Sequence, residues 1–224
     1  MCGKFSQMYS WSEIHAFSTP LDQLGDDDRD AGNDQLLVVT PMRSAAVLRL
    51  GPEDRREMVP MRWGWPDRRA GASQVRPKHM HAKGETVDRL PTFAPSFHAG
   101  RRGIVPVHSF NVGEEVGRKV VQHVLAPRDG RPLGIAVIYD TFASRDGLGL
   151  LAFVMCTTPP NPTIATVTDR MPALLPRAHW AAWLGETDAP AEAIRDLLCP
   201  WPDTLDMTPQ PAPAPRSQTA RLPL

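Results

Sequence analysis

The chain is poor in cysteine, carries no net charge and has no long apolar run. Its 224 residues include three cysteines, Cys2, Cys156 and Cys199, which are widely separated and form no Cys-x-x-Cys pair. An odd, scattered set of this kind argues against both a disulfide framework and a zinc site, and it fits a reducing cytoplasm. The apolar segment 148–156, among the longest in the chain, is far too short to cross a membrane.

Charge is balanced overall but unevenly distributed. Twenty-five basic residues match 25 acidic ones, so net charge by itself does not point to nucleic acid. Segment 1–40 holds seven acidic residues against two basic, whereas segment 62–102 holds nine basic residues against three acidic. A local basic stretch is compatible with a phosphate-binding face. It is equally compatible with a solvated surface of mixed charge. The first twenty residues lack the apolar core of a secretory signal.

Proline is abundant, at 24 residues, and therefore favours strands and loops over long helices. Apolar runs and alternation predict strands at 36–39, 45–50, 62–65, 103–107, 120–125, 133–139 and 150–157. Turn sequences at 128–130 and 144–147 predict that the last three strands form successive hairpins. A capping box at Ser10 predicts a short helix through Phe17, and further helices are predicted at 177–184 and 191–198.

These elements predict one α+β domain, rich in strands and with few short helices, over residues 1–207. From residue 208 the sequence becomes rich in proline and alanine. Such a composition is typical of an extended segment that adds little to a core, so we expect a tail over 208–224.

Cys2 is the most informative residue, because it directly follows the initiator methionine. Removal of Met1 would leave an α-amine and a thiol on adjacent carbons. That aminothiol can condense with an aldehyde to an imine, and its sulfur can then close a five-membered thiazolidine. Both groups titrate near neutrality, at about 7.7–8.0 for the amine and about 8.5 for the thiol. The alternative role for Cys2 is a small buried side chain at the start of a strand.

Several short segments, taken in order, resemble one known family. They are Met-Cys-Gly-Lys-Phe at 1–5, Met-Arg-Trp-Gly at 61–64, His-Ala-Lys-Gly-Glu-Thr at 81–86, Gly-Ile-Val-Pro at 103–106, Thr-Thr at 157–158, Asp-Arg-Met-Pro at 169–172 and Trp-Leu at 183–184. Their order and spacing are similar to those of the SOS-response-associated peptidase family, SRAP. The resemblance spans residues 2–184 and implies a strand-rich α+β fold.

The resemblance also implies a function. Members of the family lose Met1, bind single-stranded DNA or its junction with duplex, and trap the aldehyde of an abasic site as a thiazolidine crosslink. The expected partner is therefore single-stranded, gapped or junction DNA that contains abasic sites. A monomer is expected in the cytoplasm, associated with the nucleoid when bound to DNA, with no cofactor, no metal and no membrane contact. The family name reflects a suspected autoproteolytic removal of Met1.

Matching the motifs assigns site residues. The catalytic set comprises Cys2, His81 and Thr168, and the DNA-binding set comprises Lys4, Arg62, Trp63, Lys83 and Arg170. Trp63 can stack on a base next to the lesion or pack in the core. Arg170 can clamp a phosphate or form a structural ion pair. Lys83 stands where the family has arginine, so it keeps the charge but loses bidentate geometry.

The chain departs from the family at three supporting positions, where His81, Val112 and Thr168 replace asparagine, glutamate and histidine. Val112 is neither acid nor base, and Thr168 can donate a hydrogen bond but does not titrate near neutrality. His81 can carry protons, and Glu114 or Glu115 would reach the site if the loop were re-threaded. His79 and His81 would share a strand face, but a metal site needs a third ligand, and none is suitably spaced.

Three functions remain open from the sequence. The first is crosslinking of abasic sites through Cys2. The second is a catalytically degenerate relative that only binds nucleic acid. The third is an N-terminal-nucleophile peptidase, in which the thiol attacks an amide and the α-amine serves as base.

Overall fold

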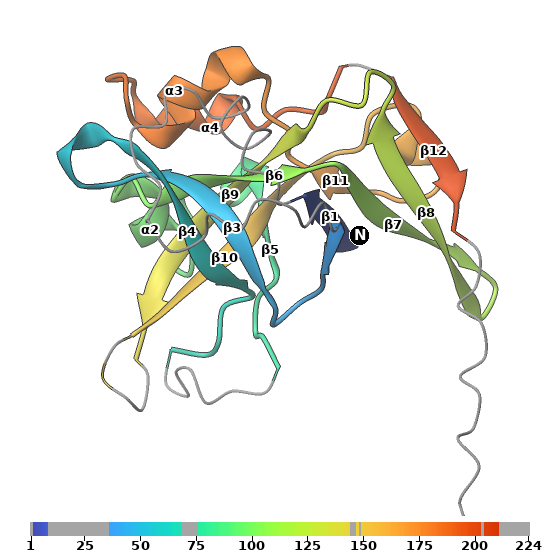
Figure 1. Cartoon of the computed structure of the whole chain (residues 1–224), viewed down its shortest axis with the longest axis horizontal. Coiled ribbons are helices and arrows are strands. Elements are labelled where there is room, and N and C mark those ends of the chain that lie inside the picture. Colours follow the sequence, from blue (N-terminus) through green and yellow to red (C-terminus); the bar gives the residue numbers. More distant parts are fainter. Residues whose placement is uncertain are drawn as a thin grey trace, which may run out of the picture.

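The computed structural model describes residues 2–8, 36–68, 76–143, 147, 149–202 and 204–210. Two β-sheets carry most of this part of the chain, and the helices are short (Figure 1). The helix expected at 10–17 and the tail after residue 210 lie outside the described residues. Among the described residues, no helix has both the length and the apolar character needed to span a membrane.

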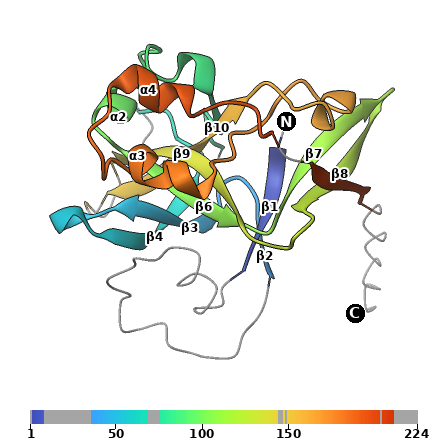
Figure 2. The same cartoon turned by 90° about the horizontal axis from the view of Figure 1, so that it is seen from above.

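The first sheet has five antiparallel strands in the order β12-β8-β7-β1-β2. Its strands are β1 (Cys2–Met8), β2 (Leu36–Val39), β7 (Ser109–Val116), β8 (Lys119–Pro127) and β12 (Leu205–Pro209). The hairpin of β7 and β8 reaches away from the rest of the molecule in both Figure 1 and Figure 2. In this strand order β1 is an inner strand, between β7 and β2.

The second sheet closes into a barrel. β10 (Leu150–Thr158) pairs with both β4 (Arg56–Trp63) and β9 (Leu133–Phe142), and the ring is completed by β3 (Ser44–Leu50) and β6 (Arg102–Val107). Two short strands, β5 (His81–Lys83) and β11 (Met171–Pro172), also pair with β10. Closure leaves β10 with partners along most of its length.

Short helical segments connect the strands. They are η1 (Pro52–Asp54), η3 (Gly84–Thr86), α2 (Ala94–His98), η4 (Ile164–Thr166), η5 (Arg177–His179), α3 (Trp180–Leu184) and α4 (Ala191–Asp196). One core cluster, which contains Phe5, Trp63 and Phe110, lies between the two sheets. A second cluster, which contains Trp180 and Trp183, lies between the barrel and the helices.

The strand-rich α+β class predicted from the sequence is confirmed, and every predicted strand except that at 62–65 corresponds closely to an observed one. The strand predicted at 62–65 instead begins at Arg56 and ends at Trp63. Gly64 follows with a φ of 109°, a left-handed conformation, and a Cβ there would lie 2.5 Å from Pro77 Cβ. The helix predicted at 177–184 is split into η5 and α3, and α4 ends at Asp196.

The predicted hairpin at 128–130 is wrong. β8 belongs to the first sheet and β9 to the second, so this turn carries the chain from one sheet to the other. By contrast, β9 and β10 pair antiparallel as expected. At the end of the domain, β12 continues to Pro209, two residues past the boundary expected at 207, and the Gln210 N–H donates to Gln122 O at 2.7 Å.

The side chain of Gln7 ties the two sheets together. β3 and β6 pair only at Leu48–Ile104 and Arg49–Gly103, so their ladder stops short of Ala46. The Gln7 amide lies at this gap: Nε2 donates to Ala46 O at 2.9 Å and Pro106 O at 3.0 Å, and Oε1 accepts from Ala46 N at 3.0 Å. Gln7 is only 1% exposed. A side-chain amide thus replaces the missing ladder and holds β1 against the barrel.

We expect Gln7→Leu to lower the free energy of unfolding by about 2–4 kcal/mol, because three backbone groups lose their hydrogen bonds to the buried Gln7 amide. Urea unfolding followed by tryptophan fluorescence measures the change. Gln122→Leu removes the same amide from a half-buried position on β8 and should cost less than about 1 kcal/mol. Equal losses in the two variants would show that Gln7 does not link the sheets.

Candidate active site

Cys2 lies at the first position of β1, between the two sheets. Its Cα partner is Val112 on β7, and a register shift separates this pair from the next, Lys4 and Asn111. The Cys2 residue is 2% exposed, and its thiol donates to Lys4 O at 3.3 Å. Burial raises the pKa of the thiol to about 12. In the chain that still carries Met1, Cys2 is therefore a neutral, covered thiol.

His81 contacts Cys2 from the barrel. It opens β5, where it is the partner of Met155 on the parallel strand β10. Its Nε2 lies 2.9 Å from Cys2 O, and it is the donor because a carbonyl only accepts. Its ring meets Trp63 edge-on, with centroids 6.0 Å apart. Burial lowers the pKa of His81, so the ring is neutral at neutral pH.

The loop through which a re-threaded chain could bring Glu114 or Glu115 to Cys2 is not re-threaded. β7 keeps a continuous register with β8 from Phe110 to Val116. Val112, fully buried, stays opposite Cys2. Glu114 instead binds His123, with Oε2 and Nε2 2.7 Å apart, and Glu115 is exposed. The acid that the family places at position 112 has no counterpart at that position here.

Thr168 follows η4 and is half-buried. Its N–H donates to Ile164 O at 3.0 Å, which closes a turn of the chain just before Arg170. This contact fixes the backbone at Thr168, and the catalytic role of its side chain stays a prediction.

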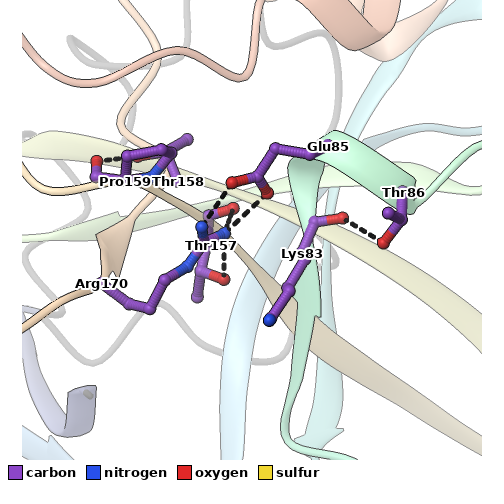
Figure 3. Close-up of polar contacts among 7 residues, drawn as sticks. All are labelled: Lys83, Glu85, Thr86, Thr157, Thr158, Pro159 and Arg170. Carbon is purple, nitrogen blue, oxygen red and sulfur yellow. Dashed lines mark hydrogen bonds and ion pairs between the residues drawn. The ribbon is translucent and has the colours of Figure 1, made fainter.

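Arg170 forms a structural ion pair, which is the second of its two predicted roles. Both of its terminal nitrogens bind the Glu85 carboxylate, and Nη2 also donates to Thr157 O at 2.7 Å and Thr157 Oγ1 at 3.1 Å (Figure 3). The ion pair joins η3, β10 and the segment before β11. Hydrogen bonding to Arg170 lowers the pKa of Glu85. A phosphate would have to displace Glu85 to reach this guanidinium.

Trp63 takes the second of its two predicted roles and packs in the core. The residue is fully buried, its ring is stacked on Phe153 at 6.5 Å between centroids, and its Nε1 donates to Met80 O at 3.1 Å. Trp63 packs in the core because inward-facing positions of β4 fill the space between the sheets.

The remaining predicted DNA-binding residues differ in exposure. Lys83 is exposed at the end of β5. Arg62 is half-buried, and burial lowers its pKa. The Lys4 amine donates to Gln210 Oε1, which also accepts from Asn111 Nδ2 at 3.1 Å. Sequence reasoning had assigned Gln210 to an extended tail, because proline on both sides hides the alternation of β12.

The two histidines of the His-x-His pair have separate surroundings. The His79 ring packs against Phe93, with centroids 5.5 Å apart, whereas the His81 ring packs against Trp63. No cluster of three or more histidine, cysteine or acidic residues suited to a metal ion occurs within the part of the chain that the structure describes.

The site therefore consists of a cysteine at the second position, buried between an antiparallel sheet and a small barrel, with a neutral histidine bound to its carbonyl oxygen. The model of the family SOS response associated peptidase (SRAP) matches residues 1–211. The chain belongs to this family.

Individual relatives are distant. The abasic site processing protein YoaM of Bacillus subtilis is 25% identical over 211 residues, which cover 92% of this chain and 88% of YoaM. A crystal structure of a Bordetella bronchiseptica protein has a TM-score of 0.76 at 21% identity, with 94% of this chain and 100% of that chain covered. A Bacteroides thetaiotaomicron structure has a TM-score of 0.74 at 20% identity, covering 93% and 91%. The structural matches show that the fold is shared.

Acid should destabilise the protein partly through His81. Because burial lowers its pKa in the folded state, the unfolded chain takes up the proton first as the pH falls below about 6.5. Stability is then lost with a slope of at most about 1.4 kcal/mol per pH unit for this one group. In urea titrations between pH 7.5 and 5.5, His81→Asn should become relatively more stable at the acid end. A difference that does not change with pH would contradict this.

Cys2 should resist alkylation while Met1 is retained. At pH 7.5 iodoacetamide should label the exposed Cys199 at least about 100-fold faster than the buried Cys2, because the thiolate is the nucleophile. Peptide mapping by mass spectrometry reads out both sites. Cys156, also buried, is the internal control, and all three should label in urea. Rapid labelling of Cys2 in the folded, unprocessed protein would refute the burial described above.

Proposed function

We propose that this protein processes abasic sites in DNA by forming a thiazolidine crosslink through Cys2 after Met1 is removed. Membership of the SRAP family and the name of YoaM, an abasic site processing protein, support the reaction class. The observation that carries the proposal is the position of Cys2 at the start of β1, between the sheets, with His81 on its carbonyl oxygen.

The chemistry needs only the terminal aminothiol and an aldehyde. The α-amine attacks C1′ of the ring-opened sugar, and the resulting carbinolamine loses one water to give an imine. The Cys2 sulfur then adds to the imine carbon while its proton passes to nitrogen, which closes the thiazolidine. Neutral His81 at 2.9 Å from Cys2 O fixes the cysteine backbone during these steps.

Burial of the thiol sets the order of events. While Met1 is attached, the Cys2 nitrogen is an amide and cannot form an imine. The thiol is also covered and protonated, since its pKa is about 12. Removal of Met1 supplies the amine, and the terminus must then open to admit a sugar. The reactive group is thereby protected in the unprocessed chain.

A single strand or a junction is the proposed DNA form. An aldehyde within duplex stacking cannot reach a cysteine between two sheets, whereas an unpaired sugar can be turned outward. Lys83, exposed at the end of the strand that begins with His81, is the first phosphate contact we propose. Lys4 and Arg170 would join it by exchanging Gln210 and Glu85 for phosphate oxygens. We further propose that the protein acts as a monomer.

The decisive experiment incubates Met1-free protein, verified by intact mass, with a single-stranded abasic oligonucleotide. A band that survives boiling in denaturing gel should form and should vanish in Cys2→Ala. Cys199→Ala removes an exposed thiol and serves as the matched control, which should crosslink normally. The absence of a covalent band with verified Met1-free protein would reject the crosslinking function.

A binding-only function is the second candidate, because Val112 and Thr168 stand where the family has a glutamate and a histidine. The same gel distinguishes it: no covalent band forms, yet the protein retards single-stranded DNA. Retardation should weaken steeply with salt as bound phosphates release counterions. In that case Lys83→Glu should weaken binding, whereas Arg43→Glu, exposed on the turn before β3, should have little effect.

A further inference from the structure

A histidine lies in the same cross-strand row as Cys2. Cys2 on β1, Val112 on β7 and His123 on β8 are successive Cα partners. Cross-strand partners project from the same face of a sheet, so His123 and Cys2 face the same side. Their strands are two spacings apart, which is about 10 Å. No motif in the sequence singled out His123.

His123 is oriented by a carboxylate. Its Nε2 lies 2.7 Å from Glu114 Oε2, and a carboxylate accepts, so Nε2 carries the proton of the neutral ring. Nδ1 is then a hydrogen-bond acceptor. His123 is 8% exposed, and its Nδ1 is buried with no hydrogen-bond partner among the described residues. Buried polar atoms are rarely left without a partner, so Nδ1 marks a position for a donor that the described residues do not supply.

An abasic sugar offers such a donor. Its deoxyribose is mostly a closed hemiacetal, and only the open aldehyde reacts with an amine. Opening moves the hemiacetal proton from O1′ to O4′ as the C1′–O4′ bond breaks, so a new C4′ hydroxyl appears. That oxygen lies four bonds from C1′, about 5 Å in an extended chain. A new C–N bond of about 1.5 Å and a hydrogen bond of about 2.8 Å bring the total span to about 9 Å.

This span is comparable with the separation of about 10 Å between the strands that carry Cys2 and His123. We propose that the Glu114–His123 pair binds the C4′ hydroxyl of the ring-opened abasic sugar and holds its aldehyde open toward Cys2. The inference rests on the proposed crosslinking function. Glu114 fixes the tautomer of the ring, and His123 Nδ1 accepts the hydroxyl proton in a hydrogen bond. His123 is thus a positioning residue that acts on the equilibrium between closed and open sugar.

The two ends of the row from Cys2 to His123 differ in their exposure to solvent. Cys2 and Val112 are 2% and 0% exposed in the chain with Met1, so the proposed binding requires an opening that uncovers both residues. At the other end of the row, the Glu114 side chain is 35% exposed. The sugar would therefore lie over the small side chain of Val112, and the pair could be reached from solvent on the Glu114 side.

The test compares two aldehydes on Met1-free protein. The first is a single-stranded abasic oligonucleotide, and the second is propanal, which has no hydroxyl and needs no ring opening. Mass spectrometry follows thiazolidine formation in the parent protein, Glu114→Gln and His123→Phe. The matched control is Glu115→Gln, which makes the same charge change at the neighbouring exposed position.

In Glu114→Gln and His123→Phe the ratio of the oligonucleotide rate to the propanal rate should fall about tenfold, the effect of one lost hydrogen bond of about 1.4 kcal/mol. Glu115→Gln should keep the parent ratio. An unchanged ratio in both test variants, including parallel slowing of both reactions, would overturn the role of the pair while the crosslinking function stands. A parent protein that reacts with propanal but not with the oligonucleotide would overturn both proposals.

Discussion

The amide of Gln7 is the contact on which the arrangement of the two sheets depends. The β3–β6 ladder stops short of Ala46, and a single buried side chain supplies the three hydrogen bonds that the gap would otherwise lack. This fixes β1 against the barrel and thereby fixes the position of Cys2, five residues earlier. A reactive N-terminus would ordinarily fray, since chain ends have few contacts. Here the terminal strand is an inner strand of one sheet and is bonded to the other.

The Cys2 thiol and the His81 ring that contacts Cys2 are both uncharged. The thiol is protonated because burial raises its pKa, and His81 is neutral because burial lowers its pKa. Both shifts have the same physical cause, the cost of charge in a poorly solvated site. Two of the cations proposed to bind DNA are held by internal partners, Arg170 by Glu85 and Lys4 by Gln210. In the proposed DNA complex, a phosphate would have to compete with these two contacts.

Many of the strands were predictable because they are apolar runs bounded by turns, and the predicted elements together indicated one strand-rich domain. β5, β7 and β11 were not predicted. The passage from one sheet to the other at 128–130, wrongly predicted as a hairpin, was not predictable, because a turn sequence does not specify whether the next strand stays in the same sheet. β12 was missed because proline conceals its alternation. At the site, the motifs placed Cys2 and His81 in one catalytic set, and in the structure the two residues are in contact. The burial of Trp63 and the ion pair of Arg170 were open alternatives that only packing could decide.

The sequence by itself determined which reaction is available to this protein, since the position of Cys2 directly after Met1 does not depend on the fold. It also determined which supporting groups are missing, because Val112 cannot titrate in any environment. Only the tertiary structure decided that the thiol is covered, that Glu114 turns to His123, and that His123 shares a row with Cys2. These facts depend on strand register and on contacts between residues far apart in the chain, and local sequence does not encode them.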